Sequence, residues 1–509
     1  MRPKARMRFG ATSLCAVVVM AVAVGCGFEG ESGEPDLSVS PGFGIDSGWA
    51  VDTEDGYVMT KLGITEPLTK VGFDGETRPS LARSWERVDE RNWRFELREG
   101  AEFHNGEPAD AEAVSESLKG VLGLSTPPPG LEPDSLQIEP AGESAVEITT
   151  SEPDPILPER LTSPNVAILA PEAYESEGPP EPFGMGTGPF ELPEEPSGES
   201  VTLEAFEGYW GGEPEAGTVE ARFIEDPQTR VQSLRAGDID LAEEVPIPQL
   251  DDLREEQDTE VVQEEVSRTV SLYTNMRSGP LEDKQVREAV RLAVDNETLA
   301  GSVMEGSATP ASSIFSPAEP WSEEAAPEEH DPERARQLLQ EAGYEPGELT
   351  LSLSTYTGRS ELPALAQAVQ SQLSEAGIET EVQVSEYSAL EPQVLEGDYD
   401  LFILTRSYLN DGNDPSGFLS DDYSCEGSYN INGYCSEEFD ALLEELEGAS
   451  EQQSRYELFR RAEGMIREDV AGVPLLYYQL RTAHDDGVSG YQTHPQEHYL
   501  LTPEIDGGG

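Results

Sequence analysis

The chain has 509 residues, with 102 Asp and Glu against 32 Lys and Arg, so its formal charge is −70 at pH 7. A negative charge of this size repels nucleic acid and argues against binding to an anionic lipid surface. Hydrophobic residues make up 36 %, and the length suffices for about three domains, so most of the chain is expected to fold around a large core. The excess of acidic residues has two explanations: a surface adapted to salt, or an amino-acid composition typical of the protein's lineage. Neither explanation indicates a function.

The N-terminus has the pattern of a secretion signal. Basic residues precede the apolar stretch "LCAVVVMAVAVG", which is too short to span a membrane as a stable helix. The stretch ends in "AVGC", and small residues directly before a cysteine resemble the lipobox of bacterial lipoproteins, where the signal is cut before a lipid-bearing cysteine. We therefore expect a signal peptide over residues 1–25, a lipid on Cys26 and a flexible tether over residues 26–48. An ordinary signal peptide cut nearby is the alternative.

Four cysteines occur in the chain. Cys15 lies in the expected signal and Cys26 takes the lipid, which leaves Cys425 and Cys435 outside the reducing cytosol. A pair of cysteines in an oxidising compartment is expected to form a disulfide. Metal ligation by the two thiolates is the alternative, but the nearby sequence offers no further Cys or His to complete a tetrahedral set.

Strand and helix patterns alternate after the tether. Alternating apolar residues predict a strand over residues 91–100, and an amphipathic helix follows with Asp110 as its N-cap. The glycines at 184–188 invite a phosphate-loop interpretation, which fails because no Gly-Lys-Ser/Thr follows. Residues 219–246 predict strand, helix and strand, and residues 283–303 predict a helix.

Residues 348–418 carry the clearest pattern. The segments "LTLSLSTY", "ETEVQVSEY" and "YDLFILTRSY" predict three strands, and "ELPALAQAVQSQLSEAG" and "ALEPQVLEG" predict the helices between them. This order implies parallel strands with right-handed crossovers. Ligands of open parallel sheets bind beyond the carboxyl ends of the strands, so "TYTGRS", "SEYS" and "SYLNDGNDPSGFL" mark the expected site.

Much of the chain resembles the solute-binding proteins of ABC importers that carry dipeptides and oligopeptides, solute-binding family 5. The segments that carry the resemblance are "RPSLARSWERVDERNWRFELREGAEFHNGEPADAEAV", "GTGPFEL", "FEGYWGGEP", "LRAGDIDLAEEVP", "LEDKQVREAVRLAVDNETLAGSVMEGSATPA", and "SYLNDGNDPSGFL" followed by "CEGSYNINGYC" and "SEEFDALL". The dipeptide-binding members are the most similar. The resemblance implies an α/β, two-lobed periplasmic-binding-protein fold of type II with an additional subdomain in lobe one. We expect lobe one over residues 49–283, lobe two over 284–475, and a return to lobe one over 476–509.

The resemblance also implies ligand-binding residues. In dipeptide-binding relatives the aspartate at the position of Asp411 pairs with the ligand's α-ammonium group, and such a charge-assisted bond is strong in a closed, dry cleft. Arg359 is placed by its spacing to meet the ligand's carboxylate, with Arg406 as the alternative, and Tyr356 and Tyr408 are expected to wall the pocket. The alternatives are solvated surface positions for Asp411 and Arg359. For Tyr356 and Tyr408 the alternative is packing in the core. The family often has Trp where Tyr408 stands.

The loop around Asp411 also invites a calcium-site interpretation. Asp411, Asn413 and Pro415 occupy the first three odd positions of an EF-hand loop, but Pro415 has no side-chain oxygen and Ser416 replaces the tight-turn glycine. Asp414 before Pro415 predicts a turn instead. We expect no metal here.

The implied function is that of the lipid-anchored substrate-binding component of an ABC importer, which captures short peptides and delivers them to permease subunits in the membrane. We expect a monomer without cofactor, on the outer face of the bacterial cytoplasmic membrane. A carrier of nickel as a metallophore complex is the alternative within the family. A secreted hydrolase is less favoured, because no nucleophile elbow, zinc-protease or Walker pattern occurs. His494 and His498 have the spacing of two metal ligands on one helical turn, but Pro495 lies between them.

Overall fold

The computed structural model describes residues 35–124, 131, 135–175, 179–196, 198, 200–322, 329–357, 359–409 and 412–508. Residues 35–509 form one compact unit, distinct from residues 1–34. The expected signal, Cys26 and the start of the tether therefore lie outside the described residues. In the part of the chain that is described, no helix combines the length and apolar character needed to cross a membrane.

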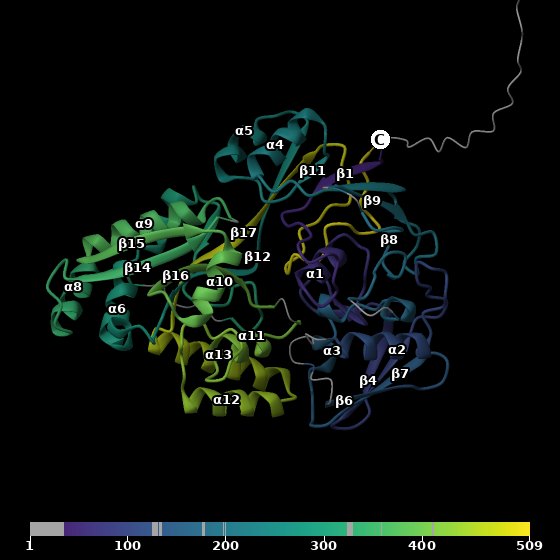
Figure 1. Cartoon of the computed structure of the whole chain (residues 1–509), viewed down its shortest axis with the longest axis horizontal. Coiled ribbons are helices and arrows are strands. Elements are labelled where there is room, and N and C mark those ends of the chain that lie inside the picture. The colour runs from purple at the N-terminus through teal and green to yellow at the C-terminus, as the bar shows by residue number, and fades with distance from the viewer. Residues whose placement is uncertain are drawn as a thin grey trace, which may run out of the picture. The chain divides into compact units, whose positions relative to one another are not determined.

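An eleven-stranded sheet runs through this unit in the order β15-β14-β16-β12-β17-β11-β1-β10-β9-β8, with β13 paired to β17 (Figure 1). Its strands are β1 (Leu37–Ser40), β8 (Phe190–Glu191), β9 (Ser200–Ala205), β10 (Thr218–Arg222), β11 (Leu241–Ala242), β12 (Thr259–Thr274), β13 (Ala308–Pro310), β14 (Leu349–Tyr356), β15 (Ile378–Ser385), β16 (Leu401–Ser407) and β17 (Gly472–Asp485). The two longest strands, β12 and β17, pair antiparallel from Thr259 opposite Asp485 to Tyr273 opposite Gly472. Because β17 reaches β11 and β12 reaches β16, this pair connects the strands of lobe one to those of lobe two.

Strand β1 anchors the beginning of the described chain. It pairs in parallel with both β10 and β11, and Leu37 and Val39 are fully buried in the core of lobe one. These residues lie inside the segment 26–48 that we expected to be a tether. The expectation of a flexible segment is wrong from Leu37 onward, because this short strand takes a central position between two others.

The additional subdomain of lobe one is built on a four-stranded sheet in the order β4-β5-β7-β6. Its strands are β4 (Ala82–Arg87), β5 (Asn92–Leu97), β6 (Leu136–Pro140) and β7 (Ala145–Thr150), and the hairpin of β2 (Thr69–Val71) and β3 (Thr77–Pro79) adjoins it. The predicted strand is confirmed, and Trp93, Phe95 and Leu97 on β5 point into the core with α2 (Ala111–Leu122). Asp110 caps this helix as predicted, since its side chain accepts from the backbone N–H groups of Glu112 and Ala113.

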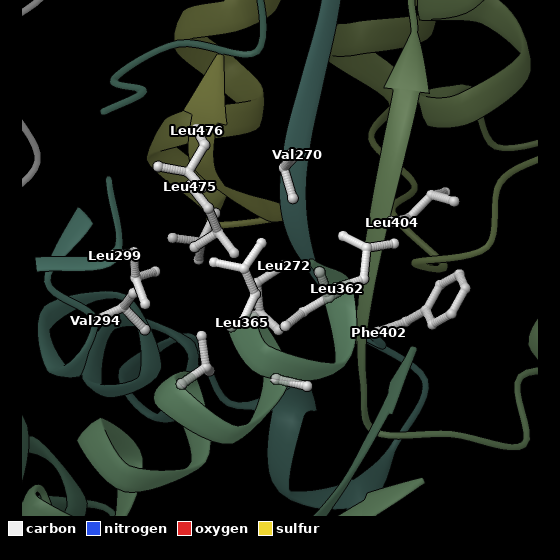
Figure 2. Packing of buried hydrophobic residues seen from close by; sticks show 14 of the residues in the cluster. Val270, Leu272, Val294, Leu299, Leu362, Leu365, Phe402, Leu404, Leu475 and Leu476 are labelled. Atoms are coloured by element: carbon white, nitrogen blue, oxygen red, sulfur yellow. The ribbon is translucent and has the colours of Figure 1, made fainter. Parts of the chain in front are cut away.

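The predicted β-α-β-α-β unit of lobe two is confirmed. Strand β14 pairs in parallel with β15 and with β16, and the connecting helices are α9 (Leu362–Glu375) and α10 (Tyr387–Glu396). Figure 2 shows Leu362 and Leu365 of α9 among Leu272 of β12 and Leu475 and Leu476 of β17. The packing of the parallel unit against the long central strands therefore forms the core of lobe two.

The remaining helices lie around these sheets. They are α1 (Glu54–Lys61), α3 (Leu157–Arg160), α4 (Pro227–Ala236), α5 (Leu250–Arg254), α6 (Lys284–Ala293), α7 (Asn296–Thr298), α8 (Pro332–Glu341), α11 (Ser416–Tyr423), α12 (Glu437–Gly448) and α13 (Gln452–Asp469). The helix expected over 283–303 is interrupted, because Val294 is extended and the Asp295 side chain caps the next turn.

A disulfide joins Cys425 and Cys435, as predicted from the sequence. It closes the segment between α11 and α12, whose Phe418 and Phe439 pack in one aromatic core. Ten positions separate the two cysteines. The bridge therefore restrains a short loop of lobe two.

Replacing both cysteines by serine is expected to lower the free energy of unfolding by about 2–3 kcal/mol, because the unfolded chain regains the entropy of the open loop. Denaturant unfolding of secreted protein carrying Cys26→Ser measures the change. A reductant should destabilise the parent and leave the double serine variant unaffected. Equal stability of parent and variant, or two free thiols in the denatured, unreduced parent, would contradict the bridge.

Candidate ligand site between the two lobes

A network of charged side chains lies where β17 meets both lobes. Glu244 follows β11 in lobe one, Arg359 and Glu361 precede α9 in lobe two, and Tyr478 and Arg481 lie on β17. Arg359 Nη1 and the Tyr478 hydroxyl both donate to the Glu244 carboxylate. Arg481 Nη2 donates to Glu361 Oε1 at 3.2 Å and lies 3.5 Å from Glu244 Oε2. The ion pairs thus link lobe one to lobe two through the central strand.

Two further ion pairs extend this network into lobe one. Lys61 Nζ lies 2.9 Å from Glu243 Oε1, with the two side chains 1 % and 3 % exposed. Arg268 of β12 donates through Nε to Glu497 Oε1 at 2.8 Å. The backbone carbonyl of Glu497 accepts from the Tyr57 hydroxyl at 2.8 Å and from Lys61 Nζ at 3.2 Å. We call these four cations and four carboxylates the interlobe charge cluster: Lys61, Arg268, Arg359, Arg481, Glu243, Glu244, Glu361 and Glu497.

Electrostatic interactions keep three members of the cluster ionised despite their burial. Burial alone would raise the pKa of Glu244, but the charges of Arg359 and Arg481 outweigh it and hold that pKa at about 2. Burial opposes the charge of Arg359, yet Glu244 and its other neighbours raise the pKa of Arg359 well above its usual value. Arg268 and Arg359 likewise outweigh burial and lower the pKa of Glu497. Glu244, Arg359 and Glu497 therefore remain charged across the physiological range.

The loop after β16 bonds to the opposite lobe. The Asn413 N–H donates to the carbonyl of Glu159 at 3.1 Å, and its Nδ2 donates to a carbonyl in the β2–β3 turn at 2.9 Å. Gln496 Nε2 donates to Asn413 Oδ1 at 2.7 Å. Gly412 has φ +148° and passes so near lobe one that a Cβ would lie 3.0 Å from the Glu159 carbonyl oxygen. Asp411, the expected ammonium anchor, precedes Gly412 in the chain but lies outside the described residues.

The turn predicted at Asp414 is confirmed. Its carboxylate accepts from Arg455 Nε at 2.9 Å and Nη2 at 2.7 Å, and from the Ser416 N–H at 2.9 Å. These bonds hold Pro415 at the start of α11. Among the residues that the structure describes, no group of three or more His, Cys, Asp or Glu is arranged to hold a metal ion.

His494 and His498 lie in the returning C-terminal segment, outside any helix. Their rings stack with centroids 5.5 Å apart, and His494 Nδ1 accepts from the backbone N–H of Gln496 and of His498, each at 3.2 Å. Burial lowers the pKa of His498 to about 3 and that of His494 well below its usual value. Both imidazoles are therefore neutral at neutral pH.

Arg359 and Tyr356 come together, whereas Tyr408 lies elsewhere. Tyr356 contributes to the electrostatic environment of Arg359, and its hydroxyl is 2.6 Å from Thr405 Oγ1. The Tyr408 hydroxyl donates to Glu319 at 3.1 Å, and its ring packs in the aromatic core of lobe two. Arg406, the alternative to Arg359, forms an ion pair with Asp422 at 2.8 Å and lies over the Tyr429 ring.

Glu244 and Glu497 belong to the interlobe charge cluster, and the sequence did not single them out. Each stands in an acidic stretch, "AEEVP" or "PQEHY", of a chain that has 102 Asp and Glu. What distinguishes them is the backbone conformation and not the sequence, since both have positive φ, 53° for Glu244 and 61° for Glu497. Residues other than glycine rarely adopt this conformation, and it often marks functional positions.

A separate cavity of about 500 Å³ lies within lobe one. Lys70, Phe73, Trp210 and Tyr499 line it, and the buried Glu66 accepts hydrogen bonds from Tyr209 and Trp210 at 2.9 Å each. Burial raises the pKa of Glu66.

Residues 76–430 match the family described as bacterial extracellular solute-binding proteins, family 5. The nickel-binding protein NikA of Staphylococcus aureus is 27 % identical over 495 residues, covering 96 % of this chain and 97 % of that protein. A probable di/tripeptide-binding protein of Pseudomonas aeruginosa is 29 % identical over 463 residues, covering 84 % and 87 %. The crystal structure of S. aureus NikA in complex with Ni(L-His)₂ superposes with a TM-score of 0.81 at 25 % identity, covering 93 % of this chain and all of that one.

The chain belongs to the extracellular solute-binding proteins of family 5, and the two-lobed α/β fold expected from the sequence is confirmed. It is therefore a substrate-binding protein of an ABC importer, of the peptide or nickel-complex type, and it works outside the cytoplasm. Its relatives are solute-binding proteins, a class that is not enzymatic.

The contact between the Asn413 loop and lobe one predicts a pH dependence. Burial, together with the nearby charge of Asp414, raises the pKa of Glu159 to about 7. An unfolded Glu has a pKa near 4.3, so folding penalises the ionised form. The contribution of Glu159 to the free energy of unfolding is therefore fully present below the unfolded pKa. It is lost as the pH rises through about 7, by about 3 kcal/mol in total.

Glu159→Gln removes this penalty. The variant should match the parent near pH 4 and exceed it by about 2–3 kcal/mol near pH 8. Denaturant unfolding of both proteins across this range measures the gap. A gap that stays constant with pH would show that Glu159 does not titrate as its burial implies.

Proposed function

We propose that the protein captures short peptides outside the membrane and delivers them to the permease of its importer. The observation that carries the proposal is the guanidinium of Arg359, which is buried at the carboxyl edge of β14 and has one nitrogen, Nη2, without a hydrogen-bond partner. A buried guanidinium nitrogen calls for an acceptor, and a carboxylate is the acceptor whose planar geometry fits it. A peptide carries that group at its C-terminus.

The ammonium end of the peptide is assigned to Asp411. Asn413 bonds to lobe one and Gly412 passes close to it, so a ligand held by this loop would contact both lobes. Tyr356, beside Arg359, is assigned to the wall of the pocket, whereas Tyr408, which packs in the aromatic core of lobe two, is not. Closure of the two lobes on the ligand would then produce the form that docks on the permease.

Asp411→Asn keeps the shape of the side chain and removes its charge. Leaving a buried ammonium without a partner costs about 2–5 kcal/mol, so the affinity for a free peptide should fall about 30-fold or more. N-acetylated peptides should bind the parent protein poorly for the same reason. Calorimetry with free and acetylated di- to pentapeptides measures both effects. Peptide binding that is insensitive to the substitution and to acetylation would remove Asp411 from the site.

A nickel complex is the second candidate. His498 is neutral and buried beside Tyr57, and neither of its ring nitrogens has a hydrogen-bond partner. A neutral imidazole is a ligand that Ni²⁺ accepts, and a complex such as Ni(L-His)₂ would bring its other donors with it. This candidate would be favoured over the first if the protein binds Ni(L-His)₂ but no peptide, and if His498→Ala abolishes the binding of Ni(L-His)₂.

The lipid anchor is a further part of the proposal. The "AVGC" site assigns the signal to residues 1–25 and places a lipid on Cys26, at the end of a segment that reaches β1 at Leu37. This would hold the protein on the outer face of the cytoplasmic membrane.

Cys26→Ser is expected to release the protein from the membrane fraction, because serine cannot take the thioether-linked lipid. Fractionation of cells and intact mass of the mature protein measure the change. Unchanged fractionation, with a parent mass that lacks a diacylglycerol, would refute the anchor.

A further inference from the structure

The cavity within lobe one is formed by segments that lie far apart in the chain. It has a volume of about 500 Å³ and lies between the end of α1, strand β2, residues 209–211 and the returning segment 490–504. Pockets that bind small molecules usually have volumes of about 300–1,000 Å³ and combine apolar walls with a few polar groups. The described residues that line this cavity include no member of the interlobe charge cluster. The cavity is therefore separate from the contact between the lobes.

A buried carboxylate holds the aromatic wall of the cavity in place. Glu66 accepts a hydrogen bond from the Tyr209 hydroxyl through Oε1 and another from Trp210 Nε1 through Oε2, each at 2.9 Å. The Arg98 guanidinium lies 3.6 Å from the centroid of the Trp210 ring and restrains that ring further. Because each oxygen of Glu66 already has a donor, this carboxylate fixes the wall and is not the group that would meet a ligand.

Lys70 brings a positive charge to the cavity and has no carboxylate partner. Its Nζ lies 5.8 Å from the centroid of the Trp210 ring and 6.0 Å from that of the Tyr499 ring. It forms no ion pair with any described residue, although the chain has 102 Asp and Glu. The faces of the two rings attract the ammonium, but its three N–H donors have no acceptor in the protein. Lys70 is thus a cation with open donors beside an aromatic wall.

Tyr499 supplies a second donor. Burial and the nearby charge of Glu66 raise the pKa of its hydroxyl, which therefore stays protonated. In the part of the chain that the structure describes, this hydroxyl has no hydrogen-bond partner. Phe73 packs against the Tyr499 ring with centroids 6.4 Å apart and is 42 % exposed, so it extends the aromatic wall toward solvent. Glu504, the other carboxylate of the lining, is exposed to solvent.

These groups fit a small aromatic acid. A carboxylate accepts charge-assisted hydrogen bonds, and a ring attached to it would pack on the aromatic wall. A cationic ligand would be repelled by Lys70, a neutral one would not use its charge, and a second negative charge would be repelled by Glu504. The formal charge of −70 opposes any anion from a distance. At 0.1 M salt, however, charges more than about 10 Å away are largely screened, so the local ammonium dominates.

We propose that the cavity within lobe one is a second ligand site, which binds a small aromatic monocarboxylate. Lys70 Nζ and the Tyr499 hydroxyl donate to its carboxylate, and its ring packs against Trp210 and Phe73. This site lies apart from the one assigned to the transported solute, so the inference does not depend on whether that solute is a peptide or a nickel complex.

Calorimetry with the purified full chain tests the site, with phenylacetate and indole-3-acetate as probes. Each acid is compared with its uncharged amide, phenylacetamide or indole-3-acetamide. The parent should bind the acids about 10-fold or more tightly than the amides, because hydrogen bonds to a charged group are stronger than those between neutral groups. Lys70→Met keeps the apolar stem and removes the charge. It should weaken binding of the acids about 10-fold or more and leave binding of the amides within about threefold.

Two further variants complete the test. Tyr499→Phe removes only the hydroxyl and should weaken binding of the acids about 3–10-fold. Because it retains the ring and its packing, it tests the site even if Lys70→Met does not fold. Lys119→Met removes an exposed lysine of α2 in the same lobe and should leave binding of the acids unchanged. A loss in Lys119→Met as large as that in Lys70→Met would show that the acids respond to charge in general, and would overturn the inference.

The remaining outcomes are equally decisive. The inference is overturned if acids and amides bind the parent equally, or if the acids bind Lys70→Met and Tyr499→Phe as tightly as the parent. It is also overturned if neither acid binds the parent at about 1 mM. A last titration adds the acid to protein saturated with the dipeptide or the Ni(L-His)₂ that it binds. Unchanged affinity for the acid supports a separate site, whereas competition would place the acid between the lobes and overturn the assignment.

Discussion

The ion pair between Glu244 and Arg359 is the contact on which the relation between the two lobes depends. Removing two charges from water costs several kcal/mol for each ion, and here the Tyr478 hydroxyl and Arg481 offset that cost. Such a pair adds little net stability, but loss of one partner leaves a buried charge and costs about 3–5 kcal/mol. The pair therefore specifies how lobe one meets lobe two more than it stabilises either. It also occupies Nη1 of Arg359, while Nη2 has no hydrogen-bond partner.

Arginine has a second structural task inside this acidic chain. Buried guanidinium groups of Arg230, Arg287 and Arg455 donate mainly to backbone carbonyls at the ends of helices and strands. A planar group with five donors can bond several carbonyls at once, which a lysine ammonium on a flexible stem does less well. These three arginines thus fix the ends of helices and strands from within the core.

Local periodicity was sufficient to predict the parallel unit of lobe two, helix α2 and the turn at Asp414, because each depends on neighbours in the chain. It could not predict β1, whose four residues become a central strand only through partners near residues 219 and 241. It also could not predict the charge cluster. Arg359 and Glu244 are 115 positions apart, and Arg268 and Glu497 are 229 apart. In a sequence so rich in Glu, only the fold distinguishes the carboxylates that meet a cation from those that meet water.

The same cluster contains buried atoms that its ion pairs leave unsatisfied. Arg359 Nη2 and Glu497 Oε2 are buried without hydrogen-bond partners, and each such group costs about 1–3 kcal/mol or more. The complete pairs, such as Glu244 with Arg359, satisfy their own atoms and carry no such cost. The two unpaired atoms are therefore the points of the cluster at which a further hydrogen bond would stabilise it most.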